Sequence, residues 1–441
     1  MTDLAAQFRA APLDAATTTS LAAHGLGARV VDDTARADLD RWHDAVARGF
    51  LEGEPDDKQH EGFAAVSAPT RRKVGVYDAA GPQPDLPVAT FASWVSELTV
   101  PGGAVPASAI SAVTVAPTHR RRGILSAVMA GELRTAAGLG VPAAVLTVSE
   151  STIYGRFGFA PAAAAASWRL DVRRARWIGP RPADPAGRID FVTRAQGRDL
   201  APALHERIRR ASPGEISMPG GHWERFFGLR PDAEKPGRTR VAQYRSAGGE
   251  VDGLVLYSVT EDTEDFTAST LDVAFLLAAT DEAYAALWRF LLSMDLVATI
   301  RASELAPDEP LWWMIADQRA ATITLRDHQY VRILDVPAML RARSFDVADT
   351  VAFEVTDPLE IAGGTFVLTT DSTGVADVDV VDDPPVGVPL VRLGIVELSA
   401  LLLGGVSAVT LARAGRLDAD DPERIARLFQ TVTAPRLSFW Y

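Results

Sequence analysis

The sequence predicts a fold that mixes helices and strands and that is divided into more than one domain. Between about residues 89 and 148 the pattern runs strand, glycine-containing turn, helix, strand, which is the order of an α/β or α+β layer. A second mixed region follows a linker rich in proline and glycine, and the length of 441 residues favours about three domains. The chain is therefore long enough to bury a sizeable core.

Composition and charge limit the partners of this chain. The sequence holds 57 acidic and 44 basic side chains, a formal net charge of −13. Nucleic acids and anionic membranes need clustered lysine and arginine, so neither is an expected partner, whereas a small cationic molecule is. The absence of cysteine from the sequence rules out disulfides, thiolate catalysis and zinc ribbons. The seven histidines form no closely spaced pair, so no metal is expected.

The N-terminal stretch and the most apolar run both argue against a membrane or secreted protein. The stretch "MTDLAAQFRAAPLDAATTTS" lacks a basic segment followed by an apolar block, so we expect no secretion signal and a cytoplasmic protein. The longest uncharged apolar run, Leu398–Ala412, is too short to cross a bilayer and contains Gly404 and Gly405. It predicts a buried helix, a turn and a strand.

The first region alternates helical and strand patterns. Leu39, Trp42, Val46 and Phe50 recur three or four residues apart and predict a helix over residues 38–52. Strands are predicted in "VATFASWVSELTV" and "AISAVTVAP", with a Pro–Gly turn between them. A helical stripe follows in "ILSAVMAGELRTAAG", and "VPAAVLTVS" predicts a buried strand.

Two further regions follow the linker "WIGPRPADPAGRID". The second, from about residue 190 to 326, includes the predicted strand "VDGLVLYSVT" and the predicted helix "DEAYAALWRFLLSMD". The third begins near Tyr330, and "TFVLTTDSTGVADVDVV" predicts two strands around a turn. The chain ends in "APRLSFWY", which is apolar and aromatic where most termini are polar.

An arginine cluster separates a strand from a helix in "VTVAPTHRRRGILSAVMA", Val113–Ala130. The free N–H groups of a first helical turn point at one spot, with the positive end of the helix dipole behind them, and Gly123 permits close backbone approach. Arg120, Arg121 and Arg122 add charge-assisted donors, an arrangement that suits a pyrophosphate. The alternative is a solvated turn with surface ion pairs.

A second motif, "SESTIYGRFGFAP", follows the buried strand and contains Tyr154. A phenol with a pKa near 10 keeps its proton at neutral pH and can donate it. The alternative is a tyrosine that serves packing only. Together, V-x-P-x-x-R-R-x-G and the I-Y-x-x-x-G-F that follows about thirty residues later resemble the acetyl-coenzyme A site of the GNAT N-acetyltransferase superfamily.

The resemblance implies a role for each part of the two motifs. Tyr154 protonates the leaving thiolate, and the arginine–glycine loop holds the pyrophosphate. Backbone N–H groups of the strand before the loop bind the pantetheine arm and can polarise the thioester carbonyl. The residues assigned to the cofactor, acetyl-CoA, are Val113, Thr114, Val115, Arg120, Arg121, Arg122, Gly123, Ile124, Leu125 and Ser149.

Longer segments bring the sequence closer to the enhanced intracellular survival (Eis) family of aminoglycoside N-acetyltransferases. "VAPTHRRRG", "SESTIYGRFGF", "ALWRFLLSMD", "RILDVPAMLRAR" and the aromatic terminus are similar to that family and cover most of the chain. The resemblance implies an α+β protein with two tandem GNAT folds, residues 1–168 and 169–328, followed by a sterol-carrier-protein-like α/β domain, residues 329–441. It also implies that only the first fold binds acetyl-CoA and that the chain forms a homo-hexamer.

The resemblance also implies where the substrate amine is bound. The terminal carboxylate of Tyr441 enters the active site as the general base; the alternative is a terminal segment docked only for stability. Trp440 stands where the family can carry an acidic residue, so one anchor for a polycationic substrate is missing. Phe50 and Glu52 occupy the region where the family contacts substrate, although a core phenylalanine and a solvated helix end are the simpler interpretations. Trp94 is expected in the core.

We therefore expect an acetyl-CoA-dependent N-acetyltransferase that acts on amines of aminoglycosides and similar polyamine-type substrates, at one or several positions. One alternative is a protein-lysine N-acetyltransferase. Another is a non-enzymatic carrier that holds an apolar ligand in the C-terminal domain. Acetyl-CoA-dependent thiol release with a panel of amines distinguishes the three.

Overall fold

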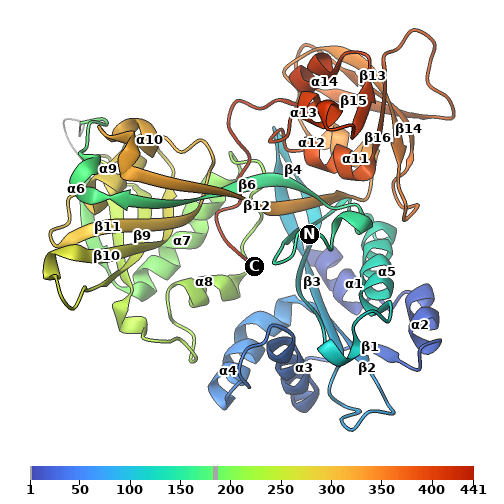
Figure 1. The fold of residues 1–441 in the computed structure, drawn as a ribbon, viewed down its shortest axis with the longest axis horizontal. Coiled ribbons are helices and arrows are strands. Elements are labelled where there is room, and N and C mark those ends of the chain that lie inside the picture. The colour runs from blue at the N-terminus through green and yellow to red at the C-terminus, as the bar shows by residue number, and fades with distance from the viewer. Residues whose placement is uncertain (1, 182–186) are drawn as a thin grey trace. The chain divides into compact units, whose positions relative to one another are not determined.

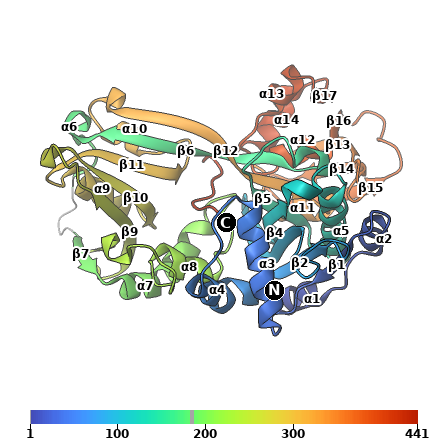
Figure 2. The same ribbon diagram turned by 60° about the horizontal axis from the view of Figure 1, so that its bottom comes forward.

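The computed structural model describes residues 2–181 and 187–441, and its contacts divide the chain into two compact units (Figures 1 and 2). The first unit contains the residues up to Ala163, His328–Val432 and Tyr441. The second contains Ala164–Asp327 and Thr433–Trp440. Both mix helices with sheet, which confirms the predicted α+β class. The predicted boundaries of three separate domains stay a prediction.

The first unit contains a mixed sheet that carries both sequence motifs. Its strands are β1 (Gly27–Val30), β2 (Arg72–Tyr77), β3 (Ala89–Val100), β4 (Gly103–Val115), β5 (Ala143–Thr147) and the last part of β12 (Ala321–Ile333). They follow one another in the order β1-β2-β3-β4-β5-β12. β3 and β4 form a long antiparallel hairpin, whereas β4 and β5 are parallel. The helix between β4 and β5 makes the crossover that a parallel pair requires.

Helices cover both faces of this sheet. They are α1 (Thr2–Ala10), α2 (Ala15–Ala22), α3 (Arg36–Gly49), α4 (Asp57–Gly62) and α5 (Ile124–Gly138), with short turns η1 (Phe63–Ser67), η2 (Ala68–Thr70), η3 (Pro117–His119) and η4 (Gly155–Phe157). Figure 1 shows α1, α2 and α5 on one side of β3, with α3 and α4 on the other. Phe8, Leu21 and Met129 are buried on the first side, and Leu39 and Trp42 on the second. The predicted helices near residues 38–52 and after Gly123 are thus confirmed as α3 and α5, but α3 ends at Gly49, before the predicted end.

A buried ion pair joins α5 to the sheet and to the end of α1. Arg72 on β2 donates from Nε and Nη2 to Glu132 on α5 at 2.8 and 3.0 Å, and both side chains are almost fully buried. Arg72 Nη1 also lies 3.5 Å from Phe8 O and 3.4 Å from Arg9 O, which are carbonyls of the last turn of α1. These contacts satisfy groups that a helix end otherwise leaves without partners.

Arg72→Met is expected to lower the free energy of unfolding by about 3–5 kcal/mol, because it leaves the Glu132 carboxylate buried and uncompensated. Urea unfolding followed by circular dichroism measures the change. Arg36→Met is the control, since Arg36 forms an exposed pair with Asp40 and such pairs contribute about 0–1 kcal/mol. Equal unfolding midpoints for the two variants would contradict the prediction.

The remainder of the first unit is a smaller layer of sheet and helices. Its elements are α11 (Val336–Ala342), β13 (Asp349–Thr356), β14 (Gly364–Thr370), β15 (Ala376–Val381), β16 (Leu390–Gly394), α12 (Ile395–Leu401), α13 (Ala408–Arg413), β17 (Leu417–Ala419) and α14 (Pro422–Phe429). The sheet order is β15-β14-β13-β16-β17, with β13 and β16 parallel. β14 and β15 form the hairpin that the Ser-Thr-Gly turn predicts.

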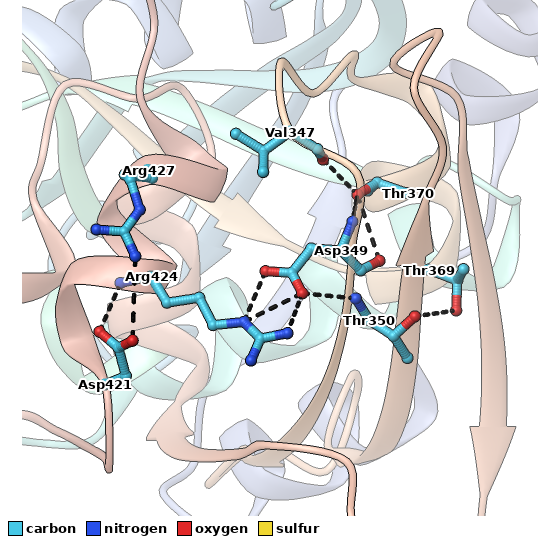
Figure 3. Close-up of polar contacts among 8 residues, drawn as sticks. All are labelled: Val347, Asp349, Thr350, Thr369, Thr370, Asp421, Arg424 and Arg427. Atoms are coloured by element: carbon cyan, nitrogen blue, oxygen red, sulfur yellow. Dashed lines mark hydrogen bonds and ion pairs between the residues drawn. The ribbon is translucent and has the colours of Figure 1, made fainter.

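A polar network ties α14 to this sheet (Figure 3). Arg424 Nε donates to Asp349 Oδ2 at 2.8 Å, and Asp421 caps the helix by accepting from Arg424 N at 2.9 Å. The hydrogen bond from Arg424 lowers the pKa of Asp349 below its usual value. Thr370 Oγ1 accepts from Asp349 N at 2.9 Å, so the backbone of Asp349 is held in place as well as its carboxylate.

The prediction of a strand after Gly405 is wrong. The run Leu398–Ala412 begins in α12, turns at Gly404, which has φ of 83°, and continues in α13. α13 packs against α14, and that tertiary contact outweighs the strand preference of Val409 and Thr410. The apolar run is therefore a pair of short helices.

The second unit repeats the strand arrangement of the first. Its elements are β6 (Ala160–Asp171), α6 (Val172–Ala175), β7 (Arg188–Val192), α7 (Arg194–Arg209), α8 (Gly220–Phe226), η5 (Pro236–Arg238), β8 (Arg240–Arg245), β9 (Val251–Thr260), η6 (Phe266–Ala268), β10 (Ser269–Ala278), α9 (Asp281–Leu292), β11 (Val297–Leu305), α10 (Leu311–Met314) and η7 (Gln318–Ala320). The order is β6-β11-β10-β9-β8-β7. An antiparallel hairpin, β9/β10, again precedes a helix and a parallel partner, β11. Leu287 and Trp288 of α9 are fully buried in the core.

Within the described ranges, 2–181 and 187–441, no helix combines the length and the apolar character needed to cross a membrane.

Candidate active site

β4 separates from its parallel neighbour β5 before β4 itself ends. The β4–β5 pairing stops at Ile110↔Leu146, whereas β4 continues to Val115 in contact with β3. A register shift against β3 and a φ of 50° at Ala112 mark a bulge at this place. In the chain as described, residues 111–115 have no strand partner on the β5 side, so backbone groups of Val113 to Val115 on that side can bind a ligand.

The arginine loop that follows has the geometry of an anion site. Arg121 and Gly123 both adopt left-handed backbone conformations, with φ of 63° and 73°. Among the described residues no side chain caps the start of α5, and nothing lies within 4 Å of the position that a Gly123 Cβ would take. A ligand can therefore approach the first N–H groups of a helix of 15 residues.

The three arginines of this loop have different surroundings. Arg120 and Arg121 are exposed. Arg122 is only partly exposed, donates from Nη2 to His24 O at 2.9 Å, and lies 3.9 Å from Asp78. Arg122 therefore already interacts with groups of the protein, whereas Arg120 and Arg121 are accessible to solvent and to a ligand. Ile124 is buried, Leu125 is partly buried against the same core, and Ser149 is exposed.

Tyr154 lies in the turn after β5, at the start of η4. Its side chain is half-buried, and its ring centroid lies 6.1 Å from that of Phe159 in an edge-to-face contact. Burial raises the pKa of Tyr154 to about 12, and the negative charge of Glu150 acts in the same direction. The phenol therefore keeps its proton throughout the neutral range, as proton donation to a thiolate requires.

Tyr441 lies at the end of the same strand. Thr147, the last residue of β5, donates from Oγ1 to the terminal Tyr441 O at 3.0 Å. The Tyr441 phenol donates to Gln329 Oε1 at 3.3 Å, and its ring meets Trp94 edge-to-face at 5.4 Å. Only 7% of Tyr441 is exposed. Of the two groups with predicted proton-transfer roles, Tyr441 thus contacts the last residue of β5, and Tyr154 lies in the turn that follows the same strand.

The neighbours of Tyr441, Thr147 and Gln329, are functional candidates that the sequence does not predict. Thr147 is 294 positions away and Gln329 is 112 positions away, and neither belongs to a motif. Trp94 is buried as expected, but it also packs against the terminal residue. No signal in the sequence could have found these contacts, because they join strands that are remote along the chain.

The end of α3 lies beside the unpaired part of β4. A Cβ on Gly49 would overlap the side chain of Thr114, so the backbone of Gly49 packs directly against that side chain. Phe50 follows directly and is 45% exposed, which excludes the core interpretation of this residue, and Glu52 is exposed too. In the second unit Trp440 is 36% exposed, with Arg326 lying 6.0 Å from its ring. The substrate roles of Phe50, Glu52 and Trp440 stay predictions.

In the second unit the parallel strands β10 and β11 also separate before they end, but residues near the C-terminus occupy the space between them. Pairing of β10 with β11 stops at Val273↔Ala302, and the remaining cavity of about 50 Å³ is lined by both strands and by Arg436 and Ser438. Arg436 N donates to Pro213 O at 2.9 Å.

Among the residues described, no group of three or more histidine or acidic side chains could hold a metal ion.

The fold and the site define a GNAT acetyltransferase with an added lipid-carrier-like domain. Residues 31–162 and 214–333 each match an acetyltransferase (GNAT) domain, and residues 336–438 match a sterol carrier protein domain. These matches confirm the two tandem GNAT folds and the sterol-carrier-like domain. GNAT domains use acetyl-CoA as their co-substrate, and the open arginine loop of the first unit fits that requirement.

Relatives of the whole chain identify the family. The chain is 34% identical to N-acetyltransferase Eis of Mycobacterium tuberculosis over 82% of its length and 86% of that protein. It is 39% identical to an uncharacterized N-acetyltransferase of Streptomyces avermitilis over 87% of its length and 91% of that protein. The crystal structure of Eis1 from Mycobacterium abscessus aligns with a TM-score of 0.78 and 29% identity, covering 94% of this chain and 100% of that one. The chain belongs to the Eis family of GNAT N-acetyltransferases.

Proposed function

We propose that this N-acetyltransferase moves the acetyl group of acetyl-CoA to amines of aminoglycosides and similar polyamine-type substrates. The observation that carries the proposal is the terminal carboxylate of Tyr441 at the end of β5, the strand that Tyr154 follows. A carboxylate is a base and a binding group for a cationic amine, and the net charge of −13 favours cationic substrates. The proposal includes a cytoplasmic location and the homo-hexamer that the family resemblance implies.

Each residue has a defined task in the proposed reaction. Backbone N–H groups at Val113–Val115 hold the pantetheine arm and polarise the thioester carbonyl, and Arg120 and Arg121 bind the pyrophosphate. The substrate nitrogen attacks the thioester carbon and forms the new C–N bond. The Tyr441 carboxylate accepts a proton from this nitrogen. Tyr154 gives its proton to sulfur as the C–S bond breaks. The substrate amine enters as an ammonium ion and loses two protons on becoming an amide. One of them restores the proton of Tyr154, and the other is released to solvent.

A panel of amines tests the substrate class. Untagged protein is supplied with acetyl-CoA and with aminoglycosides, linear polyamines, lysine-containing peptides or intact proteins, and free thiol is measured together with the mass of each product. We expect acetylated aminoglycosides, with several additions if the pocket is wide. Acetylation of proteins alone would replace the proposal with a protein-lysine acetyltransferase.

Replacing Arg120 and Arg121 together by alanine is expected to raise the KM for acetyl-CoA roughly 10- to 100-fold, because charge-assisted bonds to the pyrophosphate are lost. The melting temperature should stay the same, since both side chains are exposed. Steady-state kinetics with varied acetyl-CoA measures the effect, and Arg36→Ala serves as the control for loss of an exposed arginine. An unchanged KM in the double variant would remove the pyrophosphate assignment.

A further inference from the structure

The terminal residue is held from three strands of the first unit. β5 contributes the hydroxyl of Thr147, β12 contributes the amide of Gln329, and β3 contributes the ring of Trp94. Trp94 in turn has the Arg71 guanidinium 5.0 Å from the centre of its ring. The contacts divide the terminal residue into two parts, because Thr147 touches the carboxyl end and Gln329 touches the far end of the side chain.

Thr147 and Gln329 form one structural unit. They are directly opposite each other in the antiparallel pairing of β5 and β12. Directly opposite residues extend their side chains to the same face of a sheet, which is why both reach Tyr441. Gln329 is fully buried, and Thr147 is β-branched, so each side chain has little rotational freedom. The pair therefore presents two polar groups at a fixed spacing.

We propose that Thr147 and Gln329 are positioning residues that hold the Tyr441 carboxylate in its reactive orientation, an inference that rests on the proposed role of this carboxylate as base. A carboxylate at the end of a chain rotates freely about its Cα–C bond unless something fixes it. The Thr147 hydroxyl donates to one carboxylate oxygen and so limits this rotation. The Gln329 amide fixes the ring, so Tyr441 is held at its carboxyl group and at the far end of its side chain.

The pair also gives the site a preference for tyrosine at the last position. The buried Gln329 Oε1 accepts from the phenol, and a terminal phenylalanine would leave this acceptor without that donor. If the Gln329 amide is replaced by an apolar side chain as well, no buried acceptor is left without a donor. Tyr441→Phe and Gln329→Leu should therefore each lower kcat, and the double variant should lose less than the product of the two single losses.

Thr147→Val tests the hydroxyl with almost no change in shape. We expect kcat to fall roughly 10- to 100-fold, since a hydrogen bond to a charged group is lost, with the KM for acetyl-CoA unchanged. Thr147→Ser, which restores the hydroxyl, should recover most of kcat. Thr135→Val is the matched control, because the Thr135 hydroxyl bonds to Gly131 O inside α5 and should leave kcat unchanged when removed.

Three outcomes overturn the inference: full activity of Thr147→Val, equal loss in Thr147→Ser and Thr147→Val, or full additivity in the Gln329 and Tyr441 cycle. If Thr147→Val does not fold, the double-mutant cycle of Tyr441→Phe and Gln329→Leu tests the inference by itself. A Gly-Ser tail after Tyr441 separates this inference from the proposed function, since an amide carbonyl still accepts from Thr147 but carries no charge. An active tailed protein contradicts the base itself, whereas an inactive tailed protein with a normal Thr147→Val contradicts only the positioning role.

Discussion

A short Gly-Ser tail added after Tyr441 is expected to remove most acetyl transfer while the melting temperature and acetyl-CoA binding stay the same. The tail converts the terminal carboxylate into a neutral amide, which cannot accept a proton from the substrate. General-base catalysis contributes roughly 10²–10⁴-fold, so kcat should fall by that factor. The aromatic side chains of the terminus remain, and the Tyr441 phenol can still reach Gln329.

Thiol release under saturating acetyl-CoA measures kcat, and calorimetric titration measures cofactor binding. The same Gly-Ser sequence placed before the N-terminal methionine is the control for adding a flexible segment. A folded tailed protein with full activity would exclude the carboxylate from catalysis. Loss of cofactor binding together with activity would instead indicate that the tail disturbs the first unit.

Tyr154→Phe is the second change with a large expected effect. It keeps the ring and its contact with Phe159 but deletes the proton, so kcat should fall roughly 10²–10⁴-fold with little change in cofactor binding. Normal turnover in this variant would reduce Tyr154 to a packing residue. Tyr257→Phe is the control, since Tyr257 is a buried tyrosine of the second unit.

The pH dependence gives a second readout for Tyr154. Burial raises its pKa to about 12, which means that folding favours the neutral phenol and that the proton is fully present below pH 10. Activity should therefore show no loss from ionisation of Tyr154 as pH rises to about 10. An alkaline limb near pH 8 that disappears in Tyr154→Phe would contradict this assignment.

The sequence by itself determined the fold class and predicted the cofactor part of the candidate site. Strand and helix periods persist over ten or more residues, and the arginine–glycine loop and the Tyr154 motif are each contained in one short segment. Local order of this kind is visible in the chain because neighbours in sequence are neighbours in space. The same reasoning explains why α3, α5 and the β14/β15 hairpin were predicted correctly.

Only the tertiary structure decided the surroundings of the terminal carboxylate. Tyr441 meets Thr147 and Gln329 across 294 and 112 positions, and no periodic pattern carries information over such separations. Folding also decided that Arg122 donates to the backbone carbonyl of His24 and lies beside Asp78, and that α13 is a helix despite its β-branched residues. These details depend on which remote segments pack together. Packing and hydrogen bonding between such segments outweigh local preference wherever the two conflict.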